Sequence, residues 1–187
     1  QWSSSAASDV YKRQFISLMI IDNFLPEENL KFLQERVMWN CNFPFDLHND
    51  VATDGDGDHL DNWYGTSLIY YDSKPVIEFY EDVNSIFKDK IEDFGAWLRI
   101  KVNFYPHTAQ IYEHKQHYDY NFSHKAAIFC LNTCDGYTRI GQDIKIESVA
   151  NRFYIFDGSI PHNSTTTTNT KGRFNFNFNY VNVKKFL

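Results

Sequence analysis

The feature that most constrains the fold is a strictly alternating segment near the C-terminus, residues 173–183. From Arg173 onward the sequence reads Arg-Phe-Asn-Phe-Asn-Phe-Asn-Tyr, with aromatic residues at even positions and polar residues at odd ones. Successive side chains of a β-strand point to opposite faces, so this strand has one apolar and one polar face. A solvated face would more often carry Lys, Glu or Thr. Arg173 with Asn175, Asn177 and Asn179 therefore favours the wall of a polar pocket over an exposed sheet edge.

Other segments show the same period of two. They are residues 98–105, 109–119, 124–132, 137–147 and 152–157. Short apolar runs at 15–21 and 66–71 predict two more strands upstream. Many short strands in the second half of the chain favour a sandwich or jelly roll.

Two amphipathic helices are predicted before these strands. The first begins at Pro26 and the second at Pro75, because proline suits the first turn of a helix. Apolar residues recur at helical spacing in both: Leu30, Leu33, Val37 and Met38 in the first, and Phe79, Val83, Ile86 and Phe87 in the second. Residues 42–62 predict a polar loop, and we interpret its aspartates at 54–58 as a solvated loop or an acidic lid. The whole pattern predicts an α+β fold, a double-stranded β-helix (jelly roll) with flanking N-terminal helices.

Composition narrows the class of function. The 187 residues suffice for one domain with a substantial core. With 24 acidic and 18 basic residues the net charge is −6, which argues against nucleic acid as a partner. No apolar run is long enough to cross a membrane, so no membrane association is expected. The three cysteines lack a CxxC pair and predict free thiols in a reducing, cytoplasmic compartment.

The first 14 residues differ from the rest of the chain. A Ser/Ala run leads into Asp-Val-Tyr-Lys-Arg-Gln at 9–14. This hexapeptide resembles the translated end of a sequencing-library transposon, which suggests a metagenomic source such as a marine microbe or virus. We therefore predict a non-native or disordered tail at 1–14 and one domain at 15–187.

A metal site is predicted from His117, Asp119 and His162. His117-Tyr118-Asp119 is an HxD motif, and on a strand its first and third side chains point the same way. His162 follows the apolar strand at 152–157 and supplies a third ligand. Two histidines and one carboxylate form the facial triad of non-haem Fe(II) oxygenases, which leaves positions open for a cosubstrate and O₂.

Two further residues bear on this predicted metal site, one as an alternative ligand and one as support. His114 lies three residues before His117 and is an alternative ligand, although on an unbroken strand it would face away from Asp119. Arg173 strengthens the site, because a jelly roll brings the strand after His162 into the same cavity. An arginine there can form a bidentate pair with a carboxylate.

Together these motifs resemble a known family. His117 and Asp119, the segment Asn-Arg-Phe-Tyr-Ile-Phe-Asp-Gly at 151–158, His162 and Arg173 resemble the 2-oxoglutarate/Fe(II)-dependent oxygenases of the prolyl 4-hydroxylase-like type. Ile-Phe-Cys-Leu-Asn at 128–132 also resembles a strand of that family. The resemblance covers residues 15–183 and is tightest at 98–180.

The resemblance implies ligands and roles. His117, Asp119 and His162 would bind Fe(II), and Arg173 would pair with the distal carboxylate of 2-oxoglutarate. Asn103, Tyr105 and Asn175 are similar in position to cosubstrate contacts of the alkylation-repair demethylases. Ascorbate is a further cofactor candidate.

The chain also departs from the family pattern. The tyrosine that many prolyl hydroxylases have near Phe129 is absent. Because some members use lysine as the anchor, Lys171 remains an alternative to Arg173. Demethylases carry a second arginine where this chain has Asn179.

The resemblance therefore implies a dioxygenase that hydroxylates an unidentified peptide or small molecule, with a protein prolyl residue as the first candidate. Two alternatives remain: an alkylation-repair-type nucleic-acid demethylase, and a non-catalytic jelly-roll binding or virion protein.

Overall fold

The structure is a computed structural model that describes residues 18–51 and 60–183. The predicted tail at 1–14 and the aspartates at 54–58 lie outside the described residues. Among the described residues, no helix is long and apolar enough to span a membrane.

The two predicted helices precede most of the predicted strands, as expected. The helices are α1 (Glu27–Val37), α2 (Tyr80–Phe87) and the short 3-10 helix η1 (Lys88–Lys90). The larger sheet runs in the order β1–β9–β6–β11–β5–β3–β2, and β4 pairs with β3. Its strands are β1 (Met19–Ile21), β2 (Asp46–His48), β3 (Tyr64–Tyr71), β4 (Lys74–Pro75), β5 (Phe94–Pro106), β6 (Lys125–Cys130), β9 (Phe153–Asp157) and β11 (Gly172–Asn182). The smaller sheet, in the order β10–β7–β8, contains β7 (Tyr137–Ile140), β8 (Ile144–Glu147) and β10 (His162–Ser164).

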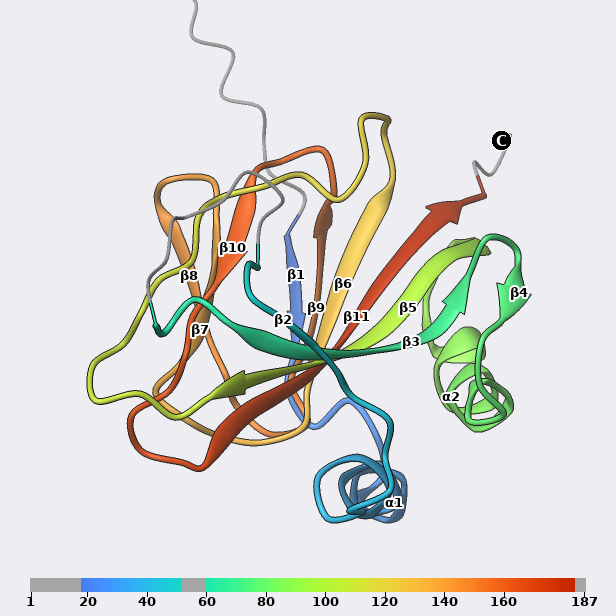
Figure 1. The fold of residues 1–187 in the computed structure, drawn as a ribbon. Helices are drawn as coiled ribbons and strands as arrows, with labels where there is room; N and C mark the ends of the chain where they lie inside the picture. Colours follow the sequence, from blue (N-terminus) through green and yellow to red (C-terminus); the bar gives the residue numbers. More distant parts are fainter. Residues whose placement is uncertain (1–17, 52–59, 184–187) are drawn as a thin grey trace, which may run out of the picture.

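The helices and the smaller sheet lie on opposite sides of the larger sheet (Figure 1). All strand pairs within both sheets are antiparallel. Two antiparallel sheets that enclose an interior, with helices outside, confirm the predicted α+β jelly roll.

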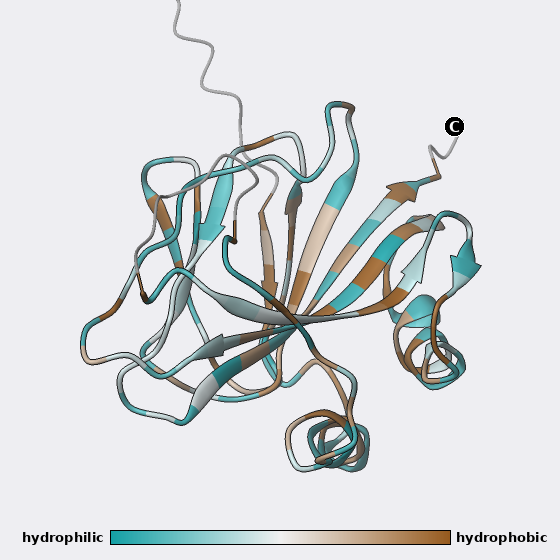
Figure 2. Cartoon of the chain, in the orientation of Figure 1, coloured by the Kyte–Doolittle hydropathy of each residue, from teal (hydrophilic) through white to brown (hydrophobic). Residues whose placement is uncertain are grey.

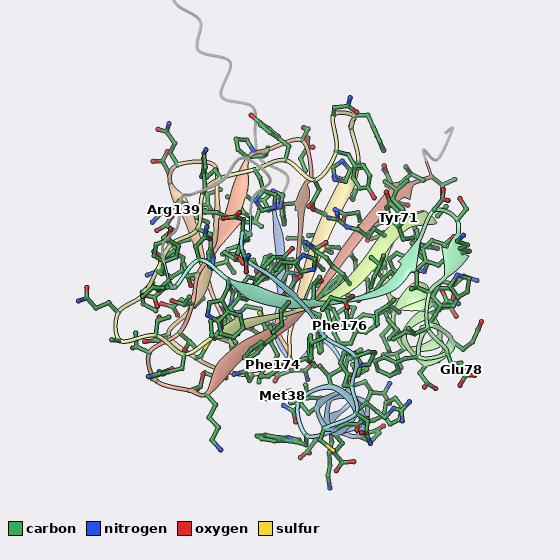
Figure 3. All side chains as sticks on the ribbon, viewed as in Figure 1. Met38, Tyr71, Glu78, Arg139, Phe174 and Phe176 are labelled. Atoms are coloured by element: carbon green, nitrogen blue, oxygen red, sulfur yellow. The ribbon has the colours of Figure 1, made fainter. Side chains whose placement is uncertain are left out.

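The main apolar core lies between the larger sheet and the helices. Phe176 and Phe178 of β11 are fully buried there with Leu33 of α1 and with Val83 and Phe87 of α2. Bands of opposite hydropathy alternate along β5 and β11 (Figure 2). Figure 3 shows Phe174 and Phe176 between the sheet and α1, whereas Arg139 lies on the smaller sheet. The even positions of β11 thus build the core, and the odd positions face the interior between the sheets.

Two predicted elements have different bounds in the structure. The second helix begins at Tyr80 rather than Pro75, because Pro75 pairs with Tyr70 in β4. The strand predicted at 137–147 is two strands, since Gly141 adopts a left-handed conformation (φ +59°) that turns the chain.

The predicted strand at 109–119 is also wrong. Only isolated bridges form there, at Glu113 and His117. The Thr166 hydroxyl accepts the backbone N–H of Tyr112 at 2.8 Å, so a side chain takes the place of a regular ladder partner. By its composition the threonine run Thr165–Thr168 predicts a solvated turn, but in the structure Thr165, Thr166 and Thr167 are buried. Its hydroxyls bond to neighbouring segments instead of water.

Candidate active site

Three side chains that can bind a metal meet at one end of the interior. The ligand atoms of His117, Asp119 and His162 all lie within 4.8 Å of one another. His117 and Asp119 belong to the connection between β5 and β6, and His162 begins β10. The HxD motif is not on a regular strand. Reciprocal backbone hydrogen bonds of 3.0 Å between His117 and His162 hold the two histidines side by side instead.

Asp119 is held from two directions. Arg99 of β5 donates to Oδ1 at 2.5 Å, and Asn179 of β11 donates to Oδ2 at 2.8 Å. Arg99 also donates to Oδ1 of Asn179 at 3.1 Å, which closes a three-residue network. Burial alone would raise the pKa of Asp119, but His162 and Arg99 outweigh it and hold that pKa well below its usual range. Asp119 is therefore a fixed carboxylate anion.

The surroundings of the two histidine rings suit metal ligands. Burial and the neighbouring His162 lower the pKa of His117 to about 4, so its ring is neutral near pH 7. In His162, the carbonyl of Ile160 lies 3.1 Å from Nδ1 and places the proton there. Nε2 of His162 is buried without a hydrogen-bond partner and lies 3.5 Å from Oδ2 of Asp119, and Nε2 of His117 lies 3.9 Å from Oδ1. Two ring nitrogens directed at one carboxylate, one of them without a partner, fit a divalent metal ion of the facial-triad class.

A polar cavity extends from this cluster between the two sheets. The β5 residues Lys101, Asn103 and Tyr105 line it together with His117 and His162. Asn103 donates to Asn175 of β11 at 3.0 Å, and both side chains are buried. The structure therefore brings the predicted residues Asn103, Tyr105 and Asn175 to the cavity that contains the histidines.

Arg173 lies fully buried at the other end of this interior. It donates to the carbonyl of Tyr137 at 2.9 Å and to Oγ1 of Thr138 at 2.7 Å, and its guanidinium carbon lies 5.3 Å from the ring centre of Tyr105. Its Nε is buried without a partner. The register pairs Arg173 with Tyr105 on β5, so both side chains occupy the same level of the interior.

The two alternative residues lie elsewhere. His114 is buried against Tyr105 (ring centres 5.5 Å apart), its Nδ1 lies 2.8 Å from the carbonyl of Ser164, and it is not part of the metal-ligand group. Lys171 is exposed and borders a different surface depression, near His107.

Two interior residues were missed by the sequence prediction, Arg99 and Lys101. The signal was present, because the polar or tyrosyl residues at 99, 101, 103 and 105 alternate with apolar ones along β5. Lys101 points into the cavity, where burial and the charge of Arg99 lower its pKa to about 8. It remains mainly protonated at neutral pH.

No protein-family model matches the chain, and no curated protein matches it. Solved structures do. A prolyl hydroxylase from Trichoplax adhaerens, in complex with a hypoxia inducible factor peptide fragment, is similar with a TM-score of 0.61 and 14% identity over 88% of this chain and 83% of its own.

Two bacterial structures are also similar. A Pseudomonas putida prolyl-4-hydroxylase has a TM-score of 0.57 and 12% identity over 90% of this chain and 95% of its own. An oxidoreductase of the 2OG-Fe(II) oxygenase family from Burkholderia pseudomallei has a TM-score of 0.61 and 10% identity over 89% of this chain and 88% of its own. The chain therefore has the fold shared by prolyl hydroxylases and other 2-oxoglutarate/Fe(II) oxygenases.

Proposed function

We propose that this chain is an Fe(II)- and 2-oxoglutarate-dependent dioxygenase that hydroxylates an unidentified substrate. The observation that carries the proposal is the meeting of His117, Asp119 and His162 in one group, where the buried Nε2 of His162 has no hydrogen-bond partner. The jelly-roll fold supports it, because structures of this fold include 2-oxoglutarate/Fe(II) oxygenases.

Two residues of the triad are prepared for metal binding by their hydrogen bonds. Iron with bound 2-oxoglutarate would supply the activation of O₂ and the oxidation of a C–H bond. The hydrogen bond from Nδ1–H of His162 to Ile160 leaves Nε2 free to bind the metal. Arg99 and Asn179 fix the carboxylate of Asp119, so that ligand geometry is set before the metal binds.

Arg173 is the proposed anchor for the distal carboxylate of 2-oxoglutarate. Its cationic side chain is buried without a carboxylate partner among the described residues, so an anionic ligand would satisfy it. Tyr105 offers a hydroxyl at the same level of the interior. Asn103 and Asn175 lie between this level and that of Lys101, where they would bind the middle of the cosubstrate.

The primary substrate is a peptide or a small molecule. A prolyl residue is the first candidate because the Trichoplax adhaerens protein is a prolyl hydroxylase in complex with a peptide. We expect ascorbate to support turnover by keeping the metal reduced. We also propose a reducing, cytoplasmic location, since Cys41, Cys130 and Cys134 are all free thiols.

Anaerobic titration with Fe(II) and 2-oxoglutarate tests the proposal. The wild type should develop the metal-to-ligand charge-transfer absorption band of a chelated 2-oxo acid. His162→Ala should abolish the band, and Arg173→Ala should weaken 2-oxoglutarate binding at least tenfold. Lys171→Ala is the matched control, because this cation lies outside the cavity and should change nothing.

The negative outcomes separate the alternatives. A wild type that forms no band and no succinate on exposure to air would be a non-catalytic binding protein. A band that survives Arg173→Ala but not Lys171→Ala would move the anchor to Lys171. Turnover stimulated by methylated nucleic acid would identify a demethylase.

A further inference from the structure

Lys101 occupies a central position in the cavity. It lies on β5 between Arg99 and Asn103, with all three side chains on the interior face. Its register partner across β11 is Asn177, which also lines the cavity. Lys101 shares that cavity with His117 and His162, so its ammonium lies in the same space as the metal-ligand group.

No described residue forms an ion pair or hydrogen bond with the ammonium of Lys101. Its Nζ lies 5.9 Å from the centre of the Tyr64 ring, and Asp119 acts on it only through space, as a charge that raises its pKa. Both oxygens of Asp119 already accept hydrogen bonds, from Arg99 and Asn179. A partly buried ammonium without an anion is costly, so a ligand anion at this position would be strongly favoured.

The charges that the proposed function brings into the cavity further favour an additional anion near Lys101. This step rests on that function. Arg99, Lys101, Arg173 and a divalent metal together carry five positive charges, whereas Asp119 and 2-oxoglutarate carry three negative ones. Among the described residues, the other carboxylate close to the interior, Glu113, is paired with Arg139. Bound metal and cosubstrate thus leave the interior with an excess of positive charge.

The distance between Lys101 and Arg173 indicates that the anion that balances this positive charge belongs to the primary substrate. Tyr105, which pairs with Arg173, lies four residues along β5 from Lys101, roughly 13 Å at the rise of a β-strand. The proposed cosubstrate site extends from Arg173 past Asn103 to the metal. Lys101 lies at the metal end of this path, between Asn103 and Arg99, which holds the metal ligand Asp119, so its ammonium adjoins the metal group rather than the anchor.

We propose that Lys101 binds a carboxylate of the primary substrate, close to the carbon that is oxidised. The substrate class is therefore a molecule with a carboxylate near its reactive C–H bond, such as a free acid or a C-terminal residue of a peptide. A neutral residue in the middle of a peptide would leave the Lys101 ammonium without an anion.

Matched acid and amide probes test this proposal. The probes are N-acetyl-L-proline, N-acetyl-L-leucine and benzoate, each paired with its own amide. Their binding to the protein loaded with Fe(II) and 2-oxoglutarate is measured anaerobically by calorimetry, and the charge-transfer band is recorded in parallel. Lys101→Met removes the charge at similar length, and Lys101→Arg retains it.

In the wild type and in Lys101→Arg, at least one acid should bind ten times more tightly than its amide. Lys101→Met should lose that preference while its affinity for 2-oxoglutarate and its melting temperature stay close to those of the wild type. The proposal is overturned if no acid is preferred or if Lys101→Met keeps the preference. It is also overturned if that variant loses 2-oxoglutarate affinity, which would assign Lys101 to the cosubstrate. Absence of the band in the wild type would instead contradict the proposed function.

Discussion

The two faces of β11 have different roles, one in the apolar core and one in the interior between the sheets. Phe176, Phe178 and Tyr180 face the helices and are almost fully buried in the apolar core. Arg173 and the asparagines on the other face are equally buried, yet they face the interior between the sheets. One strand therefore contributes to stability with one face and to ligand binding with the other.

The difference lies in how each face compensates for burial. The apolar face needs only close packing, which ring contacts such as Phe87–Phe178 provide (centres 4.6 Å apart). The polar face needs a partner for each donor and acceptor, and Oδ1 of Asn177 and Nε of Arg173 have none. A row of buried polar groups that is only partly satisfied costs stability, so its presence points to ligands that complete it.

The largest expected effect comes from disrupting the apolar face. Phe178→Ala removes a ring that also contacts Trp97 and Phe153, and should lower the free energy of unfolding by about 3–5 kcal/mol. The exposed Trp39 provides the control, because Trp39→Ala should change it by less than about 0.5 kcal/mol. Urea denaturation measures both. Equal effects of the two substitutions would contradict the assignment of the main core to this face.

A substitution on the polar face should have a smaller effect, which is expected on the affinity for the metal. Asn179→Leu removes the donor to Oδ2 of Asp119 without a change of charge, and should weaken metal binding by about tenfold. Asn177→Leu is the matched control, because Asn177 lies on the same face but has no hydrogen bond to Asp119. Calorimetric titration with Mn(II) compares the variants. Similar affinities for both would show that Asn179 does not orient the ligand.

The same contrast explains what the sequence could predict. Strict alternation identified both faces of β11, because a period of two needs no tertiary information. The histidines and Asp119 were identified by residue type and spacing, although the expected strand for the HxD motif does not form. Its geometry comes from the backbone bonds between His117 and His162, which are 45 positions apart and have no local sequence signal.

The residues that hold Asp119 were harder to predict for the same reason. Arg99 and Asn179 converge only because β5 and β11 are neighbours in register. The buried threonines that follow Ser164 were misread because a run of hydroxyl side chains is typical of solvated turns. Only the structure shows their partners on other segments, such as Asp135 and Thr108.

The smallest predicted effect is a loss of stability at low pH, which we expect from the side of the larger sheet that faces the smaller sheet and not from the apolar core. Glu113 lies on the side of the smaller sheet, where it accepts hydrogen bonds from Arg139 at 2.5 and 3.0 Å, from Tyr137 at 2.5 Å and from Asn163 at 3.0 Å. The hydrogen bonds from Arg139 are the largest cause that lowers the pKa of Glu113 from 4.5 to about 2, against the opposing effect of burial.

Because the pKa of Glu113 is lower in the folded than in the unfolded chain, its contribution to stability is complete above about pH 4.5 and is lost as the pH falls towards 2. The side chain is about one-third exposed, so solvent screening keeps this contribution small. Glu113→Gln should flatten the fall of the urea midpoint with decreasing pH, whereas Phe178→Ala should lower the midpoint equally at every pH. An unchanged acid slope in Glu113→Gln would show that the Glu113–Arg139 pair does not make the polar side sensitive to acid.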